Sequence, residues 1–247
     1  MKLVSKKDKK RKSTSAGTAS GNANVNALNL SDKNKFAIVE SYKIARTNIM
    51  FSLAASEKKV FAVTSYSKGE GKSTASANLA ISFSKMEKKV LLIDADMRRP
   101  NIHNIFKLNN ESGLSNVVSK MASFEDSVNR DVISNLDVLS AGVVPPNPSE
   151  LLCSAFFVKL MEELSEEYDY IIIDTPPIGV VADALLLKDF IAGFVVVARE
   201  RGTTHRDLSK LLESMKLADV KVLGLIEVGC DISAKKRKKK YSYYQYY

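Results

Sequence analysis

The stretch from residue 61 to residue 86 constrains the fold more than any other part of the chain. It reads FAVTSYSKGEGKSTASANLAISFSKM: a short apolar run, a turn that ends in the Gly-Lys-Ser triplet 71–73, and a helical pattern. In that pattern Leu79, Phe83 and Met86 have the i, i+4, i+7 spacing of one buried helical face. A strand, a glycine-bearing turn and a helix in this order predict a phosphate-binding loop.

The chemistry of such a loop explains its residue types. Glycines let backbone N–H groups close on a β-phosphate, the Lys72 ammonium neutralises β and γ oxygens, and the Ser73 hydroxyl can hold Mg²⁺. The helix that follows points its positive end at the anion. The residues predicted to bind the nucleotide are Lys68, Gly69, Glu70, Gly71, Lys72, Ser73 and Thr74.

Only the second half of the full loop pattern is present. The pattern G-x-x-x-x-G-K-[ST] places its first glycine at position 66, which is Tyr66 here. A bare Gly-Lys-Ser also occurs in surface turns, so the flanking strand and helix carry the interpretation. A dinucleotide site needs G-x-G-x-x-G, and residues 69–74 have no third glycine. A dehydrogenase is therefore set aside.

The rest of the chain alternates between strand and helix patterns, which predicts an α/β fold of the P-loop NTPase type: a mostly parallel sheet with helices on both faces. Continuous Ile/Val runs indicate strands that are buried on both sides. The predicted strands are 60–65, 89–94, 135–140, 169–174, 193–198 and 221–227, and the predicted helices are 36–54, 72–85, 101–107, 148–167, 181–190 and 204–216. Asn147 is the expected cap of helix 148–167, with Pro148 in its first turn and Glu150 as the capping-box partner.

The net charge of +9 lies at the two ends of the chain. Residues 1–12 are rich in lysine, residues 235–240 read KKRKKK, and the body between them is slightly acidic. Basic ends suit an anionic membrane face, an acidic partner or a polynucleotide, or serve only solubility. We expect a disordered basic arm (1–32), one P-loop domain (33–231) and a basic, tyrosine-rich tail (232–247).

Other function classes find little support in the sequence. Cys153 and Cys230 lack metal-type spacing and are interpreted as reduced thiols of a cytosolic protein. His103 and His205 form no cluster, so zinc chemistry is not expected. No apolar run reaches the 18 or so residues of a membrane span, and the start has no signal-peptide core, so any membrane association is expected to be peripheral.

Two predicted strands end in aspartates: VLLIDAD in Asp94 and Asp96, and YIIID in Asp174. Ligands of open α/β sheets gather at the carboxyl ends of strands. Carboxylates beside a triphosphate loop can hold Mg²⁺ through its waters, and one can orient or deprotonate an acceptor hydroxyl. Taken singly, such aspartates are more often helix caps or solvated turn residues. Arg98 and Arg99, which follow, either neutralise phosphate charge or are plain surface charge.

Four segments together resemble the bacterial tyrosine kinases of capsule and exopolysaccharide systems: GEGKS, VLLIDADMRRP, AGVVPPNPSELL and YIIIDTPP. The resemblance spans about residues 36–227 and is to the form in which the kinase is a separate cytoplasmic chain. It implies an ATP- and Mg²⁺-dependent protein tyrosine kinase that phosphorylates itself and regulates polysaccharide synthesis and chain length. It also implies a place at the inner face of the cell membrane.

The resemblance implies partners as well. The first is a membrane adaptor, the polysaccharide co-polymerase, which would contact the kinase through a short cytoplasmic segment. The second is a phosphotyrosine phosphatase, and the third is further copies of the chain in a homo-oligomeric ring. Nucleic acid is not an expected partner. The family's ring motif E-x-x-R-x-x-R appears as Glu40, Lys43 and Arg46. Lysine replaces the first arginine and cannot form the same bidentate pair.

The resemblance also implies roles for the site residues. Lys72 and Ser73 belong to the first Walker motif, as phosphate and magnesium contacts. Asp94 and Asp96 belong to the family's second aspartate motif, with Asp94 as the base or metal group, and Asp174 belongs to the Walker B strand. The predicted catalytic residues are thus Lys72, Asp94 and Asp96, and the predicted metal residues are Ser73, Asp94 and Asp174.

Partition and septum-site ATPases share this fold. The competing interpretation is therefore that the chain is an ATPase switch of this type, which binds membrane or DNA. These ATPases carry an additional lysine at the position of Ser67, whereas this chain has Lys68 one place later, which favours the kinase. Near the nucleotide base the resemblance leads one to expect an asparagine where Glu227 stands, so the sequence predicts phosphate binding but not the choice of base.

The tail supplies hydroxyl acceptors, and in the resemblance it is the autophosphorylation cluster. The 12 steps from Asp231 to Tyr243 span at most roughly 40 Å, enough to reach a neighbouring subunit's site. Each phosphate adds about −1.5 to −2 charge, so several would offset KKRKKK. A tail that stacks on nucleic acid is the alternative. The predicted acceptors are Tyr241, Tyr243, Tyr244, Tyr246 and Tyr247.

Overall fold

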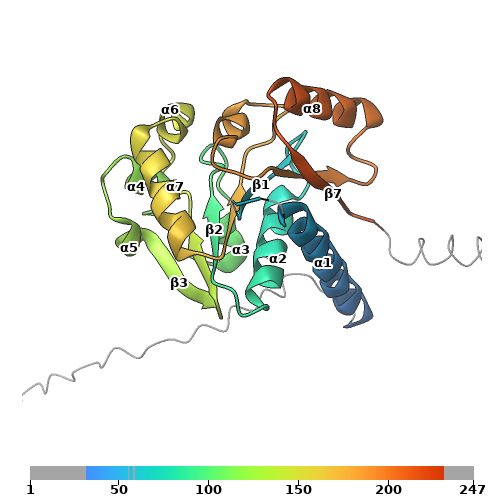
Figure 1. Cartoon of the computed structure of the whole chain (residues 1–247), viewed down its shortest axis with the longest axis horizontal. Helices are drawn as coiled ribbons and strands as arrows, with labels where there is room; N and C mark the ends of the chain where they lie inside the picture. The colour runs from blue at the N-terminus through green and yellow to red at the C-terminus, as the bar shows by residue number, and fades with distance from the viewer. Residues whose placement is uncertain (1–31, 55, 58, 231–247) are drawn as a thin grey trace, which may run out of the picture.

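The computed structural model describes residues 32–230 except 55 and 58, with side chains from residue 36 onward (Figure 1). Its elements are α1 (Asp32–Leu53), β1 (Val60–Ser65), α2 (Lys72–Ser84), β2 (Val90–Asp94), α3 (Ile102–Phe106), α4 (Leu114–Val118), α5 (Phe124–Ser127), β3 (Val128–Ile133), β4 (Leu136–Leu139), α6 (Pro148–Leu152), α7 (Ala155–Glu167), β5 (Tyr170–Asp174), a 3₁₀ helix (Asp183–Leu187), β6 (Phe194–Arg199), α8 (His205–Leu217) and β7 (Val222–Val228).

The strands form one seven-stranded sheet in the order β3-β4-β2-β5-β1-β6-β7. All neighbours are parallel except β3, which runs antiparallel to β4 at one edge. The prediction of a mostly parallel sheet is therefore confirmed. Strand β1, which leads into the Gly-Lys-Ser turn, lies between β5 and β6 near the middle of the sheet.

Alternate strand residues feed two separate hydrophobic cores, one on each face of the sheet. On one face α1, α2 and α3 cover side chains such as Phe61 and Val63 of β1. On the other, α4, α7, α8 and the 3₁₀ helix cover Val60 and Ala62. All six residues of β1 are buried, as expected for a strand covered on both sides.

Three local expectations need correction. The predicted helix 148–167 is two helices, because Ser154 ends one turn and caps α7 by accepting the N–H of Phe157 at 3.2 Å. Asn147 makes no side-chain capping bond at the start of α6. The predicted helix 181–190 shortens to a 3₁₀ turn. The short elements α4, α5 and β3, of which α4 is mostly buried and the other two are half exposed, had no clear sequence pattern and were not predicted.

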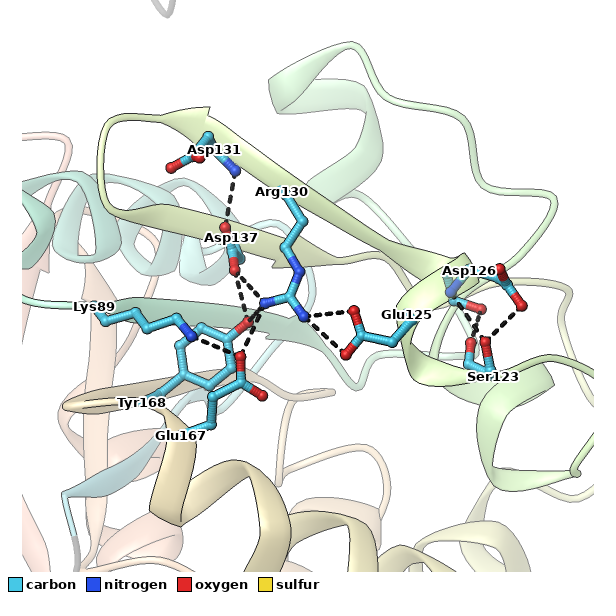
Figure 2. Close-up of polar contacts among 10 residues, drawn as sticks. Lys89, Ser123, Glu125, Asp126, Arg130, Asp131, Asp137, Glu167 and Tyr168 are labelled. Atoms are coloured by element: carbon cyan, nitrogen blue, oxygen red, sulfur yellow. Dashed lines mark hydrogen bonds and ion pairs between the residues drawn. The ribbon is translucent and has the colours of Figure 1, made fainter.

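A polar network fastens the β3 edge, with Arg130 at its centre (Figure 2). Arg130 donates to both carboxylate oxygens of Glu125 at 2.9 and 2.8 Å, to Asp137 Oδ2 at 2.9 Å and to the Tyr168 hydroxyl at 2.7 Å. The Tyr168 hydroxyl in turn donates to Asp137 Oδ2 at 2.6 Å. Asp137 and Tyr168 lie near the starts of β4 and β5, so this network stabilises the end of the sheet remote from the Gly-Lys-Ser turn.

The predicted arm (1–32) and tail (232–247) lie outside the described residues, apart from Asp32, with which α1 begins. The five predicted acceptor tyrosines are in that tail. None of the helices that the structure describes is long and apolar enough to cross a membrane.

Candidate active site

The predicted site residues converge because β2, β5 and β1 are neighbours and end at the same edge of the sheet. Asp94 at the end of β2 is paired in register with Asp174 at the end of β5. Asp174 also lies opposite Val63 of β1, two residues before the strand ends. The loop after β1 and the aspartates of both other strands therefore share one edge, as ligand sites of open α/β sheets do.

The loop between β1 and α2 has a backbone that only glycine adopts easily. Gly69 and Gly71 have φ of 77° and 89°, in the left-handed region where a Cβ is strained. Gly71 is the residue before α2, and its carbonyl accepts the N–H of Ala75 at 2.9 Å. The free N–H groups at the start of α2 therefore point toward the loop, which is the arrangement that binds phosphate.

The Glu70 side chain braces this loop. The carboxylate is buried, and its Oε2 accepts the N–H groups of Tyr66 and Ser67, both at 3.0 Å. Its Oε1 accepts the hydroxyl of Thr203, which lies in the turn after β6. Glu70 was predicted to contact the nucleotide, and the structure turns its side chain to the protein, which leaves only its backbone for a phosphate.

Arg199, at the end of β6, provides a second brace that the sequence did not reveal. Its Nη1 donates to the Gly69 carbonyl at 2.8 Å, and its backbone N–H donates to Thr203 Oγ1 at 2.8 Å. No local pattern marks Arg199 or Thr203, since both reach the loop only through the pairing of β6 with β1. Arg199 binds the Gly69 carbonyl and Thr203 binds the Glu70 carboxylate, so these two residues hold the loop from the side opposite the aspartates.

Lys72 extends from α2 toward the aspartates. Its Nζ lies 2.7 Å from Asp96 Oδ2 and 3.6 Å from Asp174 Oδ2, and it donates to Ser73 Oγ at 3.4 Å. Burial lowers the pKa of Lys72, but the negative charges of Asp174, Asp96 and Asp94 outweigh it and raise the pKa above its ordinary value. Lys72 therefore keeps its positive charge among these carboxylates.

Asp94 and Asp96 are two residues apart but lie in different environments. Asp94 is fully buried: its Oδ1 accepts the N–H of Asp96 at 3.2 Å, and its Oδ2 accepts those of Asn101 and Ile102 at 3.0 Å. Burial and the charge of Asp174 raise its pKa to about 7, against the opposing effect of the two Oδ2 hydrogen bonds. Asp94 thus fixes the turn that presents Asp96.

Asp174 is also fully buried, and burial raises its pKa, while Lys72 and the hydroxyls of Ser73 and Ser76 oppose that shift. Oδ1 accepts the Ser76 hydroxyl at 3.0 Å. Oδ2 has no hydrogen-bond partner among the described residues. The same residues include no set of three acidic, histidine or cysteine side chains that could hold a metal by themselves. A metal here therefore needs Ser73, water and phosphate oxygens as further ligands.

A pocket of about 610 Å³ opens over the loop. Asp96 lines it, whereas the fully buried Asp94 and Asp174 do not. The residues around it are Lys68, Gly69, Gly71, Lys72, Ser73, Thr74, Asp96, Arg98, Arg99, Asn101, Pro176, Pro177, Val180, Val181 and Arg199. Every residue predicted to bind nucleotide is in this set except Glu70, which lies behind the loop.

The residues of the predicted ring motif lie elsewhere, on α1. Lys43 Nζ contacts Glu40 Oε1 at 2.7 Å within the helix. Arg46 turns inward and donates to the Ser82 carbonyl of α2. The opposite side of α1 exposes large apolar groups, with Phe36, Ile44 and Phe51 exposed to 68%, 63% and 76%. These exposed apolar groups are available to another molecule.

Comparison with known proteins agrees with this geometry. Residues 56–246 match the family described as ParA, NUBPL iron-transfer P-loop NTPase. The chain is 40% identical over 223 residues to the putative tyrosine-protein kinase CapB of Staphylococcus aureus, which covers 90% of this chain and 96% of that protein. It is 42% identical over 208 residues to the tyrosine-protein kinase YwqD of Bacillus subtilis (strain 168), covering 84% and 85%.

Solved structures share the fold. The crystal structure of the chimerical protein CapA2B2 superposes with a TM-score of 0.76 at 37% identity, over 79% of this chain and 86% of that one. The septum-site-determining protein MinD with Mg-ADP from Pyrococcus horikoshii OT3 superposes with a TM-score of 0.59 at 24% identity, over 70% and 72%. The second likeness shows the fold alone.

Proposed function

The chain belongs to the bacterial tyrosine kinases of capsule systems, and from that membership we propose that it transfers the γ-phosphoryl group of ATP to tyrosines of its own C-terminal cluster. The observation that carries the proposal is the contact of Lys72 with Asp96, at 2.7 Å, on the floor of the pocket that the phosphate loop lines. A cation suited to binding phosphate and a carboxylate suited to accepting a proton lie side by side there, which supports the proposal.

The loop binds the phosphates. Its N–H groups and the start of α2 face the pocket, and Lys72 neutralises β and γ oxygens. Mg²⁺ fits the remaining groups: the Ser73 hydroxyl and, through water, the Asp174 Oδ2 that lacks a hydrogen-bond partner among the described residues. When bound, the ion neutralises charge on the β and γ oxygens.

Asp96 is the proposed base. It lines the pocket, while the carboxylate of Asp94 is already occupied by backbone N–H groups. The acceptor tyrosine oxygen bonds to the γ-phosphorus, the bond from that phosphorus to the β–γ bridging oxygen breaks, and ADP leaves. The hydroxyl proton passes to Asp96. Asp94 then acts through position, which revises its expected role as the base or metal group.

The acceptors are the five tyrosines between residues 241 and 247. The segment from Asp231 to Tyr243 spans at most roughly 40 Å, so a site on a second copy is within reach. We assign the contact between copies to α1, where the motif residues Glu40 and Lys43 are open to a second copy, together with the exposed apolar groups Phe36, Ile44 and Phe51. The third motif residue, Arg46, is held on the Ser82 carbonyl. Homo-oligomers in which each tail reaches a neighbour's pocket follow from this arrangement.

The proposal extends to the setting of the reaction. A cytoplasmic segment of a membrane polysaccharide co-polymerase activates the chain and holds it at the inner face of the membrane, and a phosphotyrosine phosphatase reverses the modification. The basic segments 1–12 and 235–240 favour an anionic membrane surface. In this way the phosphorylation state of the tail regulates capsular or exopolysaccharide synthesis and chain length.

An ATPase switch of the partition or septum-site type is the second candidate, favoured by the fold shared with MinD and by the basic ends. Product stoichiometry separates the two. Protein purified from its own cells with its membrane partner is incubated with ATP and Mg²⁺, and ADP, inorganic phosphate and phosphotyrosine are measured together. A kinase forms about one phosphotyrosine per ADP, whereas a switch releases ADP and inorganic phosphate without phosphotyrosine.

A further inference from the structure

We propose that Lys68 and Arg99 form a second anion site at the rim of the pocket, and that its ligand is a phosphotyrosine already made on the tyrosine cluster. The site would hold that group while a neighbouring tyrosine reacts at Asp96. This inference rests on the proposed function, because its ligand is the product of the proposed reaction.

Five cations line the pocket, and their partners distinguish them. Lys72 is paired with Asp96 at 2.7 Å. Arg98 contacts both oxygens of Asp183, at 2.7 and 3.2 Å. Arg199 donates to the Gly69 carbonyl.

Lys68 and Arg99 are the other two. Both side chains are exposed, and within residues 32–230, 55 and 58 excepted, neither makes a hydrogen bond or an ion pair. Two uncompensated positive charges therefore border the pocket.

Both cations stand on backbone that is held in place. The Arg99 N–H donates to the Asp96 carboxylate (Oδ1) and to the Asp96 carbonyl, both at 3.1 Å, so Arg99 is fixed to the turn that presents the proposed base. Lys68 precedes Gly69, whose carbonyl Arg199 holds at 2.8 Å. One cation thus comes from the phosphate loop and the other from the turn after β2, the two segments that carry Lys72 and Asp96.

The charges of the acceptor segment point to a modified tail as the ligand. Residues 235–240 are six basic residues that directly precede the tyrosine cluster, so rim cations repel the unmodified tail. A phosphotyrosine brings about −1.5 to −2 charge, and a guanidinium binds phosphate with paired N–H donors. Lys68 and Arg99 therefore do not help the unmodified tail to bind for the first transfer, but they favour binding of a phosphorylated tail for the later transfers.

The spacing of the acceptors suits such a site. Neighbouring tyrosines in the cluster are one or two residues apart, which is roughly 3.5 to 7 Å along an extended chain. Arg99 and Asp96 lie in the same turn after β2. A phosphorylated tyrosine is therefore within reach of Arg99 when its neighbour in the tail is at Asp96. The consequence is that once one tyrosine is modified, the others on that tail follow preferentially.

The test measures binding apart from transfer. The enzyme is the full chain with its five tail tyrosines replaced by phenylalanine, loaded with ADP and Mg²⁺. The probes are two synthetic peptides of residues 235–247, one unmodified and one with phosphate on Tyr244 only, and their affinities are measured by calorimetry. We expect the phosphopeptide to bind about tenfold more tightly or better, as charge-assisted bonds to phosphate allow.

The variants Lys68→Gln and Arg99→Gln should each lose most of that preference, whereas Lys216→Gln, an exposed lysine on α8, should keep it. Equal affinity for the two peptides overturns the proposal, as does a preference that survives in both rim variants. Weaker ADP binding in the variants with an unchanged peptide preference overturns it too, because the cations would then serve the nucleotide.

Transfer to the same two peptides separates this inference from the function on which it rests. Selective binding of the phosphopeptide without transfer from ATP to either peptide supports the anion site and contradicts the kinase proposal. Transfer at equal kcat/KM to both peptides supports the kinase and contradicts the anion site.

Discussion

The Thr203 hydroxyl donates to the buried Glu70 carboxylate across a separation of 133 residues. Through this bond the turn after β6 holds the phosphate loop that follows β1. Glu70 also accepts two N–H groups from the start of the loop, so one carboxylate fixes both the loop's shape and its contact with the neighbouring strand. The loop is in this way shaped before any phosphate reaches it.

Replacing Thr203 therefore weakens ATP binding more than it slows transfer. Thr203→Val keeps the volume and removes the hydroxyl, which leaves one Glu70 oxygen without its donor; we expect the KM for ATP to rise about tenfold or less with a smaller change in kcat. Steady-state kinetics check this result.

The adjacent Thr204 is the matched control for that variant. It caps α8 by accepting the Asp207 N–H at 3.2 Å, and among the described residues its side chain hydrogen-bonds only to Asp207 and not to the loop. Thr204→Val should cost about 1 kcal/mol of stability and leave the KM for ATP unchanged. Equal effects of the two valine variants on that KM would show that Thr203 acts only through general stability.

The raised pKa of Asp94 makes stability depend on pH. Burial and Asp174 raise this pKa from an ordinary value of 3.8 to about 7. Between these values the folded protein holds a proton that the unfolded chain has released, so unfolding becomes easier as pH rises. The stabilising contribution is complete below about pH 4 and is lost by about pH 7.

Asp94→Asn removes that titration. The variant loses a carboxylate that accepts N–H groups of Asn101 and Ile102, a cost that does not vary with pH. The difference in free energy of unfolding, wild type minus variant, should therefore fall as pH rises from 4 to 7. Urea unfolding at several pH values measures it, and a difference that stays constant over this range contradicts the assignment.

The Arg130 network should stabilise the fold without touching the site (Figure 2). Arg130→Ala leaves the largely buried Asp137 and the Tyr168 hydroxyl without their cation, and we expect a loss of about 2 kcal/mol in the free energy of unfolding with no change in ATP affinity.

The exposed pair of Lys159 with Glu163 gives a comparison within the same molecule. Their side chains are 72% and 64% exposed, so Lys159→Ala should cost less than about 0.5 kcal/mol. Chemical denaturation compares the two variants, and similar losses in both would mean that the network adds no more than a surface ion pair.

If copies of the chain assemble through α1, a charge at an exposed apolar position of this helix should disrupt the oligomer. Ile44→Glu places a charge on the exposed outer face of the helix, where it would be buried and unpaired between copies. The molar mass measured by light scattering should fall toward that of a single chain. Leu217→Glu, at a residue of α8 that is 89% exposed, is the control and should not change the mass. Assembly that survives Ile44→Glu would place the interface elsewhere.

Local patterns made much of the fold predictable. The strand predicted at 60–65 is β1, and the helix predicted at 72–85 is α2, because apolar spacing and glycine turns act over a few residues. The helix break at Ser154 was not predictable with the same rules, since a serine within an apolar helical pattern shows no sign that it will cap a new helix. Edge strand β3 is half exposed and carries no periodic signal.

The site was predictable in its residues but not in their division of labour. The positions of Lys72, Asp94, Asp96 and Asp174 at or just after predicted strand ends predicted that they share one edge of the sheet. The sequence could not reveal that the turn after β2 directs Asp96 into the pocket and gives Asp94 to backbone N–H groups. Nor could it reveal Arg199, which depends on strand pairing across 130 residues.

Phosphotyrosine on the C-terminal peptide is the most direct test of the central claim. Protein from its own cells, where any adaptor is present, is digested, and residues 241–247 are examined by mass spectrometry beside a Lys72→Met version of confirmed folding. The account predicts several modified tyrosines in the wild type and none in the variant. An unmodified tail in both, or modification that persists without Lys72, would contradict it.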